Sequence, residues 1–430
     1  MFTYLFLFLL FPFSLLADDL IVPSEKFGTI QSALNFSATG DKILLRPGTY
    51  QENISIKTAI HLTSADPTNP AIIDGSLRGR TIDVFSPKVS LSHLKIINSG
   101  DDIGETDACI YIQKKARGIN LQYNHLSQCA FGIWVNGTTD VIIKHNFISG
   151  IQRKYYSDRG NGINLWAVKN GQIEYNTITE VRDGIYLTVT KKMLVKNNMM
   201  YKVRFGIHYM YNDDNTLIKN TVCHSMVGLA MMFSKRLVIK GNRAINNAQH
   251  GILFRSIYDS KISQNYVHGN NKGLFLNDAS FNTITSNLVE ENKIGTHVTA
   301  GSEENAVTKN NFVANPIQVK YTWRRSQHWD SKKVGNYWSD YLGWDFDNNK
   351  VGDKIYYASN RMDHLIFKYP QIKLLAQSPA VQLLQSLESR FPVLRPPSII
   401  DRTPAIAPFK LEAKLFSGKQ QKFIQHHCKS

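Results

Sequence analysis

FGIHYMYNDDNTLIKNTVCHSMVGLAMMFSK (205–235) contains one full repeat of this chain and the start of the next. Gly206 opens a run in which apolar residues alternate with others, and Asn220 is followed two residues later by an apolar residue. Gly228 then opens the next run, 22 residues after Gly206. Alternation with a period of two is typical of a β-strand that buries one face.

The same unit recurs along most of the chain. The opening glycines are 22 or 23 residues apart, with one interval of 30 residues. The glycines are Gly132, Gly162, Gly184, Gly206, Gly228, Gly251, Gly273 and Gly295, and the asparagines are Asn124, Asn146, Asn176, Asn198, Asn220, Asn242, Asn265, Asn287 and Asn311.

A unit of this length, with short strands and no helical pattern, is too small for a propeller blade but fits one coil of a parallel β-helix. Successive coils would stack at the strand spacing of about 4.8 Å. An asparagine that recurs at one turn suits a ladder of amide hydrogen bonds along the stack. The sequence therefore predicts an all-β fold, a parallel β-helix of about 22 residues per coil.

The two ends of such a stack are open sheet edges that must be covered. Ile30, Ala33 and Leu34 have helical spacing and predict an N-terminal cap. After residue 320 the repeat gives way to a segment rich in Trp and Tyr, which predicts a C-terminal plug, and Ser378 is placed to cap a following helix. The expected segments are a β-helix at 18–320, an aromatic plug and helical docking segment at 321–400, and a basic flexible tail at 401–430.

Composition narrows the class of protein. With 43% hydrophobic and 20% charged residues the chain can bury a core, which excludes a disordered or polytopic membrane protein.

The apolar run at 5–16 is too short to span a bilayer and is typical of the central region of a secretory signal, cleaved after Ala17. Export would allow the four cysteines to form two disulfides, but their spacing indicates no pairing and the fold needs none. A net charge of +16 permits acidic partners without choosing among them.

The second and fourth residues after each repeat glycine should point outward. None of them is Asp or Glu in the repeats opened by the glycines above, whereas a glycosidase or lyase needs carboxylates there. An apolar stripe instead predicts a partner surface. Its aromatic members are Trp134, Trp166, Tyr186 and Phe275.

His208, Met210 and Met232 stand near the centre of this stripe. His208 and Met210 share one strand, and Met232 has on the next coil the position that Met210 has on its own. Thioether and imidazole groups together favour Cu(I), because soft ligands select soft metals. The sequence predicts a Cu(I) contact at these three residues; the alternative is that the methionines only pack.

Two further groups resemble metal sites. Asp345, Asp347, Asn349 and Asp353 alternate like a calcium loop, but the central glycine and closing glutamate of an EF-hand are missing, so a hydrogen-bonded turn is the alternative. The terminal HHCKS offers His and Cys ligands, although the end of a flexible tail is more often inert.

Longer motifs are more specific than the repeat. GNGINLW (160–166), RDGIYL (182–187), FGIHYMYNDDN (205–215) and GNYWSDYLGWDFDNN (335–349) resemble the NosD family, periplasmic maturation proteins of nitrous oxide reductase. The resemblance extends over residues 20–405, while the last 25 or so residues depart from the family pattern.

The resemblance implies a right-handed parallel β-helix without an active site of its own, on the periplasmic face of the inner membrane. Such a protein docks on an ABC-type permease whose ATPase supplies energy, receives copper from a membrane-anchored chaperone, and helps to assemble the copper–sulfur cluster of apo nitrous oxide reductase. It has no nucleic-acid partner, and its cargo is copper or a sulfur species. We expect the permease contact on the apolar side of the C-terminal helix, at Val381, Leu384, Leu387 and Phe391.

Two other functions are compatible with export and with the fold. A secreted carbohydrate-active β-helix, such as a lyase, epimerase or hydrolase, would require paired carboxylates on the outward face. It would also leave the methionine cluster and the aromatic C-terminal plug unexplained. A structural or adhesive solenoid would predict a blander outward stripe.

Overall fold

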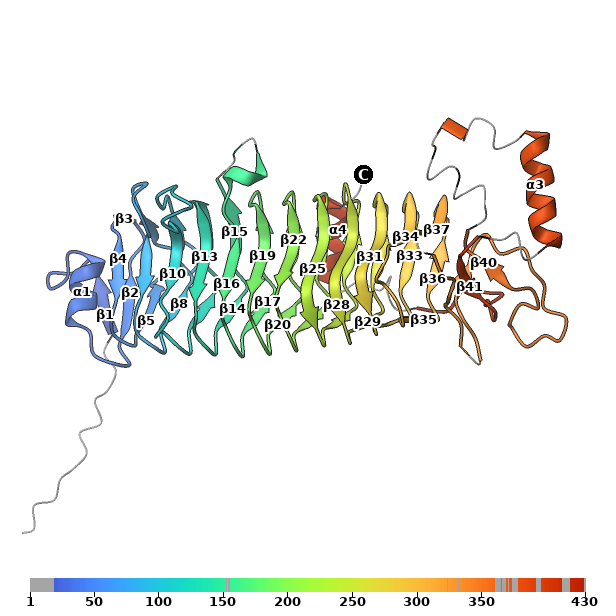
Figure 1. Cartoon of the computed structure of the whole chain (residues 1–430). Helices are drawn as coiled ribbons and strands as arrows, with labels where there is room; N and C mark the ends of the chain where they lie inside the picture. The colour runs from blue at the N-terminus through green and yellow to red at the C-terminus, as the bar shows by residue number, and fades with distance from the viewer. Residues whose placement is uncertain are drawn as a thin grey trace, which may run out of the picture.

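A computed structural model describes residues 19–151, 153, 155–322, 324–331, 333–359, 365, 369, 371–372, 378–391, 396–411 and 418–428. The chain coils into a long parallel β-helix whose axis runs through most of the molecule (Figure 1). The proposed signal segment at 1–17 lies outside the described residues. In the described part of the chain, no helix is long and apolar enough to span a bilayer.

Three parallel sheets form the sides of the β-helix, and each coil gives one strand to each sheet. Sheet I is β1 (Asp19–Val22), β2 (Lys42–Leu45), β5 (His61–Ser64), β8 (Ser90–Ser92), β11 (Asn120–Gln122), β14 (Ile142–Lys144), β17 (Gln172–Glu174), β20 (Leu194–Lys196), β23 (Thr216–Ile218), β26 (Val238–Lys240), β29 (Lys261–Ser263), β32 (Thr283–Thr285) and β35 (Ala306–Thr308). Sheet II is β4 (Ile54–Ile56), β7 (Ile82–Val84), β10 (Ala108–Ile112), β13 (Phe131–Asn136), β16 (Ile163–Trp166), β19 (Asp183–Thr188), β22 (Phe205–Met210), β25 (Val227–Lys235), β28 (His250–Tyr258), β31 (Lys272–Ser280), β34 (Ile294–Val298) and β37 (Ile317–Tyr321).

Sheet III is β3 (Thr49–Gln51), β6 (Ile72–Asp74), β9 (Lys95–Ile97), β12 (His125–Cys129), β15 (Phe147–Gly150), β18 (Thr177–Thr179), β21 (Met199–Tyr201), β24 (Thr221–Cys223), β27 (Arg243–Ile245), β30 (Tyr266–His268), β33 (Leu288–Glu290), β36 (Asn311–Val313) and β39 (Tyr337–Trp338). A small sheet of β38 (Gln327–His328), β41 (Ile399–Asp401) and β40 (Tyr356–Tyr357) lies at the C-terminal end. The helices are α1 (Ile30–Phe36), the 3-10 turn η1 (Tyr156–Asp158), α3 (Pro379–Arg390) and α4 (Gly418–His427).

The predicted fold is confirmed. The inward positions of the repeat fill the interior, as Ile185, Ile207 and Leu229 show on three successive coils, each with no exposed surface. Full burial of one such side chain stabilises the fold by about 1.5–3 kcal/mol. The repeat glycine is needed because the coil is crowded at this position: a Cβ at Gly206 would lie 2.4 Å from the buried side chain of Val222 and 2.6 Å from the backbone oxygen of Gly228.

The asparagine ladder also forms, and each amide bonds the next coil. The Nδ2 group of Asn220 donates to Oδ1 of Asn242 at 2.9 Å, and its own Oδ1 accepts from Asn198 at 3.0 Å. The predicted last member was wrong by one residue: Asn287 bonds Asn310, and Asn311 instead bonds the backbone of Phe409. Asn310 occupies the ladder position, because its side-chain amide continues the ladder by donating to Oδ1 of Asn336 at 2.9 Å.

Both ends of the β-helix are covered. At the N-terminal end α1 buries Ile30, Ala33 and Leu34 against the first coil. At the C-terminal end the rings of Trp329 and Trp338 are 1% exposed and lie over the core as continuations of the stack.

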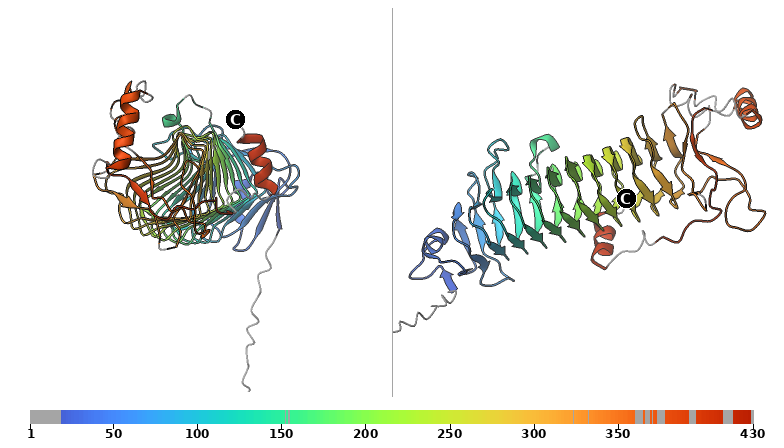
Figure 2. Two further views of the ribbon diagram at one scale, coloured as in Figure 1. Left: turned by 90° about the vertical axis from the view of Figure 1, so that its right-hand side faces the viewer. Right: turned by 60° about the horizontal axis from the view of Figure 1, so that its bottom comes forward.

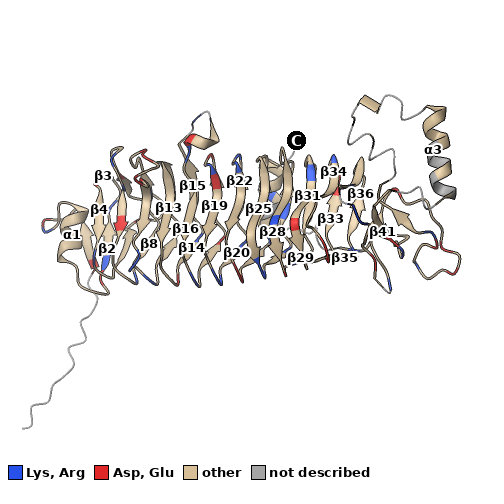
Figure 3. Cartoon of the chain, viewed as in Figure 1, with Lys and Arg blue, Asp and Glu red and all other residues tan. Residues whose placement is uncertain are grey.

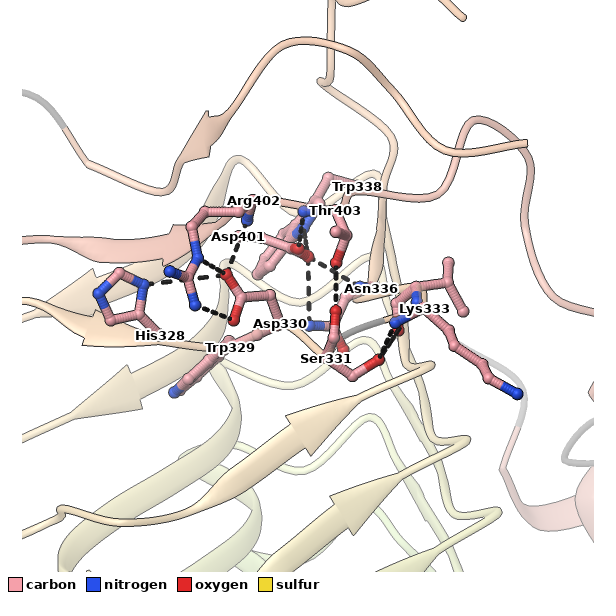
Figure 4. A network of polar contacts seen from close by, with 11 residues as sticks. His328, Trp329, Asp330, Ser331, Lys333, Asn336, Trp338, Asp401, Arg402 and Thr403 are labelled. Atoms are coloured by element: carbon pink, nitrogen blue, oxygen red, sulfur yellow. Dashed lines mark hydrogen bonds and ion pairs between the residues drawn. The ribbon is translucent and has the colours of Figure 1, made fainter. Parts of the chain in front are cut away.

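A polar network holds the C-terminal end together (Figure 4). The carboxylate of Asp401 accepts hydrogen bonds from the Trp338 indole at 2.9 Å and from the backbone of Asn336 at 2.8 Å. Burial raises the pKa of Asp401 despite these bonds. Its neighbour Arg402 binds Asp330 through two nitrogens, at 2.6 and 3.1 Å.

The tail was expected to be flexible, and for its described end this is wrong. Helix α4 lies along the flank of the β-helix (Figure 2), where Cys428 forms a disulfide with Cys223 of β24. Phe423 is 6% exposed, and the ring of His427 stacks on Tyr201 at 4.4 Å. A contact across 205 residues leaves no local signal in the sequence, so the tail could not be placed from its composition.

The cysteine pairing that the sequence left open is thereby settled. Besides Cys223–Cys428, Cys109 of β10 bonds Cys129 at the end of β12, 20 residues further on. Both bonds fit an oxidising compartment.

Replacing Cys428 with serine is expected to release α4, because the disulfide joins the tail to the body of the protein. The free energy of unfolding should fall by about 2–4 kcal/mol, the usual effect of losing a disulfide that closes a long loop. Limited trypsin digestion measures the release directly, with faster cleavage in 410–422 than in wild type. A C109S/C129S variant is the control, since its tail should stay protected; equal protection of the tail in C428S would show that packing alone holds α4.

Candidate functional site

The outward face of sheet II carries the predicted stripe, but its aromatic residues do not gather in one place. Trp134 packs on Phe131 with ring centroids 4.7 Å apart, and Trp166 is 49% exposed. Phe275 lies on β31, six strands from Trp134 on β13, which corresponds to about 29 Å. The stripe therefore consists of separate clusters along the β-helix.

The cluster around His208 unites the predicted histidine and methionines on β22 and β25. Met210 pairs in register with Met232, as the repeat predicts, while His208 pairs with Ala230. The small Ala230 is fully buried, in a cluster with Val227, and Met226 and Met232 pack against this cluster. Met226 adds a further thioether to this cluster. The sequence analysis did not include it, because it precedes the strand and so lies outside the alternating positions.

His208 is buried, which differs from the expected exposed position. Only 6% of its surface is accessible, because the rings of Tyr186 and Phe205 lie against the imidazole at 4.7 and 4.9 Å. The third neighbour is a carboxylate, Asp183 of β19, whose Oδ2 is 3.0 Å from Nδ1 of His208. The imidazole is therefore held in one orientation by an acid and two aromatic rings.

Asp183 is the residue of the His208 cluster that the sequence analysis did not include. It has no exposed surface, and Arg204 donates to it through two nitrogens at 2.7 and 2.8 Å. Burial alone would raise the pKa of Asp183, but the hydrogen bonds from His208 and Arg204 lower it below its ordinary value. The carboxylate is thus ionised at neutral pH.

The sequence contained a signal for Asp183. Asp183 directly precedes the repeat glycine, Gly184. The register pairs Asp183 with Phe205 and Ile185 with Ile207 and leaves out the glycine between them, so Asp183 lies outside the strict alternation. The residue before the glycine therefore lies beside the outward position of the next coil. Counting the outward positions from the glycine leaves Asp183 out.

The hydrogen bond from His208 to Asp183 fixes the tautomer of the imidazole. Because an ionised carboxylate can only accept, Nδ1 of His208 carries the proton, and the lone pair is left on Nε2. This Nε2 atom is buried and has no hydrogen-bond partner among the described residues. A carboxylate that holds the far nitrogen of a histidine is the usual support of a metal ligand.

The two methionines place soft donors on the same outward face as His208, one on its own strand and one on the next. The hydroxyl of Tyr186 donates to Sδ of Met210 at 3.4 Å, and Met232 is half-buried next to it. Among the described residues no three His, Cys, Asp or Glu side chains gather to hold a metal. A ligand set of one imidazole and thioethers is suited to Cu(I) and poorly suited to Zn²⁺ or Ca²⁺.

The predicted calcium loop is a turn that bonds to itself. Oxygens of Asp345 accept from the backbone of Asn349 and Lys350 at 3.1 and 2.9 Å, and Asp353 accepts from the backbone of Phe346 at 2.7 Å. The Asp347 carboxylate accepts from the side chain of Asn349 at 2.7 Å. These bonds correspond to the hydrogen-bonded turn that the sequence left as the alternative.

The expected docking helix forms as α3, beyond the last coil (Figure 1), and Ser378 caps it by accepting from the backbone of Val381. Val381 is 8% exposed, whereas Leu387 and Phe391 are 37% and 52% exposed. The side chain of Leu384 lies outside the described residues.

Solved structures share the fold. The Dettilon tailspike protein matches with a TM-score of 0.54 at 15% identity, over 66% of this chain and 62% of the tailspike chain. A catalytic domain of a GH87 α-1,3-glucanase matches with a TM-score of 0.51 at 12% identity, over 71% of this chain and 66% of the glucanase chain. At this identity the likeness concerns the β-helix alone.

Curated relatives are similar in sequence as well. The chain is 34% identical over 386 residues to a protein of Pseudomonas aeruginosa named "Probable ABC transporter binding protein NosD", covering 86% of this chain and 90% of the relative. A protein of the same name from Stutzerimonas stutzeri is 35% identical over 393 residues, with 88% and 89% covered. Residues 145–343, which include the His208 cluster, match the family model described as periplasmic copper-binding protein (NosD). The chain therefore belongs to the NosD family of periplasmic copper-binding proteins.

Proposed function

We propose that this protein is a non-catalytic periplasmic subunit that accepts Cu(I) at His208, Met210 and Met232 and hands it on during assembly of the copper–sulfur cluster of nitrous oxide reductase. The observation that carries the proposal is the buried Nε2 of His208, which has no hydrogen-bond partner among the described residues. A buried nitrogen lone pair without a partner is costly unless a ligand fills it.

The residues around His208 have separate tasks in this proposal. Asp183 holds the proton of the neutral imidazole on Nδ1, which makes Nε2 the metal-binding atom, and Arg204 balances the charge of the buried carboxylate. Met210 and Met232 complete a soft site of low coordination number. Thioethers are neutral, so they bind Cu(I) without the strong hold of thiolates, which suits a cargo that must be passed on.

Copper transfer through such a site is an exchange of ligands. Nε2 and the two sulfurs replace the ligands of the donor one at a time, and the receiving protein replaces them in turn. The metal keeps its oxidation state, and no covalent bond in the protein breaks. The carboxylate at the centre of this face is already bound by His208 and Arg204, so it is not placed to act as a general acid or base.

The ABC-type permease and its ATPase are the proposed membrane partners, and α3 is the proposed contact. Leu383, Leu387 and Phe391 expose apolar surface on a helix that lies beyond the last coil. Exposed apolar surface of this kind favours a protein contact. A membrane-anchored chaperone as copper donor and the apo-reductase as acceptor complete the proposal.

A cell-based experiment tests the proposed function. Nitrous oxide reductase is purified from cells that lack this gene and carry either the wild-type gene or the H208A/M210L/M232L variant, and its copper content and spectrum are measured. The reductase should lack its catalytic cluster in the deletion and in the variant, and wild type should restore it. A normal reductase in the deletion would contradict the role and bring the carbohydrate-active alternative forward.

Copper affinity measured in vitro tests the proposed binding site separately from the proposed role in the cell. Competition with a Cu(I) chelator should show that M210L/M232L weakens binding by about tenfold or more, roughly 1.4 kcal/mol. Met200 is the matched control, because its thioether is fully buried in the core, so M200L should leave the affinity unchanged. Equal affinities for all variants would remove copper from this site.

A further inference from the structure

A second polar cluster lies on sheet II, beyond the apolar patch of Val227, Ala230 and Leu253. It consists of His250, Lys272, His297 and Lys320 around the ring of Phe275. His250 lies on β28, two strands and about 10 Å along the stack from His208 on β22. The motifs and the copper proposal leave this cluster without a role.

The strand register brings these side chains together. His250 pairs with Lys272, Phe275 pairs with His297, and His297 pairs with Lys320. His250 and His297 lie on the two strands that flank β31, and each ring centroid is 5.0 Å from that of Phe275. Nζ of Lys272 is 4.7 Å from the centroid of the same ring. Five side chains from β28, β31, β34 and β37 thus form one compact surface.

The surface is positively charged and partly removed from water. Lys272, Lys320 and both histidines are half-buried. Burial lowers the pKa of Lys272, and the charge of Lys320 lowers it further. Burial and the charge of Lys272 lower the pKa of His250 to about 4. Burial and the charges of Lys272 and Lys320 lower the pKa of His297 to about 4, so both rings are neutral at pH 7. The groups that act on the two histidines are cationic or neutral, with no carboxylate among them.

Polar atoms of both imidazoles and of Lys272 lack a polar partner in the part of the chain that the structure describes. Nδ1 of His250 and Nδ1 of His297 are buried without a hydrogen-bond partner among the described residues. Within the same part of the chain Lys272 makes no ion pair. The nearest acid of β31, Asp278, accepts from Ser256 and Tyr258 at 2.8 Å at the other end of the strand. Figure 3 shows basic segments near β31 and β34.

We propose that His250, Lys272, His297 and Lys320 form a binding site for an oxyanion, either a free inorganic anion or a carboxylate of a docked protein. An anion would offset the positive charge of Lys272, which the nearby charge of Lys320 disfavours, and would accept N–H hydrogen bonds from the neutral imidazoles. Phe275 provides the apolar floor that keeps water away from these contacts. The anion site does not depend on copper binding, so failure of the copper proposal would leave the anion proposal unaffected, and the reverse also holds.

The test follows the two imidazoles by NMR. Protein labelled at the histidine Cε1 positions is titrated at pH 7 with sulfate, with a tetraglutamate peptide and with a tetraglutamine peptide. The signals of His250 and His297 should shift and saturate with sulfate or tetraglutamate, and their pKa values should rise because a bound anion favours the imidazolium. His268 is the internal control, since Glu290 and Glu291 lie 3.8 Å from its nitrogens on sheet III and leave no room for an anion.

Matched lysine variants show whether the effect is local. K272Q/K320Q should weaken the anion response by about tenfold or more. K261Q/K309Q removes the same charge from exposed lysines on sheet I and its following turn and should leave the response unchanged. A response to sulfate with none to tetraglutamate assigns the site to a free anion, and a stronger response to tetraglutamate assigns it to an acidic protein segment. No saturable shift, or an equal shift in K272Q/K320Q, would overturn the site.

Discussion

Replacing Asn220 with alanine is expected to lower the free energy of unfolding by about 4 kcal/mol. The buried amide makes four hydrogen bonds: Oδ1 accepts from the backbone and side-chain nitrogens of Asn198, and Nδ2 donates to Asn242 and to the backbone oxygen of Val195. Alanine leaves these partners buried and unpaired, and each unpaired group costs about 1–3 kcal/mol. Urea unfolding followed by circular dichroism measures the loss.

The size of this effect depends on burial within the ladder. Asn271, which is exposed, is the matched control, and Asn271→Ala should change the stability by less than about 0.5 kcal/mol. If Asn220→Ala were as mild as the control, the asparagine ladder would contribute little, and the apolar core alone would hold the coils together.

Replacing Asp183 with alanine is expected to damage both stability and copper binding. It leaves Arg204 without its bidentate partner and Nδ1 of His208 buried without an acceptor, which should cost about 3–5 kcal/mol. Cu(I) affinity should fall about 10- to 100-fold, as when the supporting acid of a metal-bound histidine is removed. Chelator competition and urea unfolding measure the two effects. Asp183→Asn, which can still accept from Nδ1, should retain more of the copper affinity.

The stability difference between wild type and Asp183→Ala should depend on pH in one direction. The folded state lowers the pKa of Asp183, so its stabilising contribution is fully present above the ordinary pKa of about 3.9 and is lost as the pH falls through the folded value. The difference should stay constant between about pH 5 and 8 and shrink below about pH 4. Asp214→Asn is the control: it removes the charge of an exposed partner of Arg236, keeps a residue type that tolerates the positive φ of 57° at this position, and should change the stability by less than about 0.5 kcal/mol. A difference that grew in acid would contradict this assignment.

Most of the fold was predictable because a repeat makes local signals add up. Each coil repeats the same choice of glycine, inward apolar residues and buried asparagine, so one misplaced residue, such as Asn311 for Asn310, left the architecture unchanged. The position of the tail was not predictable in the same way. The disulfide between Cys223 and Cys428 joins parts of the chain that share no repeat.

The strand register of the candidate site was predictable from the sequence, but the burial of its side chains was not. Strand alternation placed Met210 beside Met232 and His208 on the same face. It gave no information on Asp183, which lies where the glycine interrupts the alternation, or on the rings of Tyr186 and Phe205 that bury the histidine. Burial on the outer face depends on the size of neighbours one coil away, which only the assembled stack reveals.

X-ray absorption at the copper edge tests the central claim most directly. The protein is loaded with one equivalent of Cu(I), and its spectrum is compared with those of M210L/M232L and H208A. We predict a first shell that combines sulfur and imidazole nitrogen in wild type, loss of the sulfur contribution in M210L/M232L, and loss of the imidazole contribution in H208A. A shell of nitrogen and oxygen alone in wild type, or the same spectrum in all three proteins, would contradict copper binding at His208, Met210 and Met232.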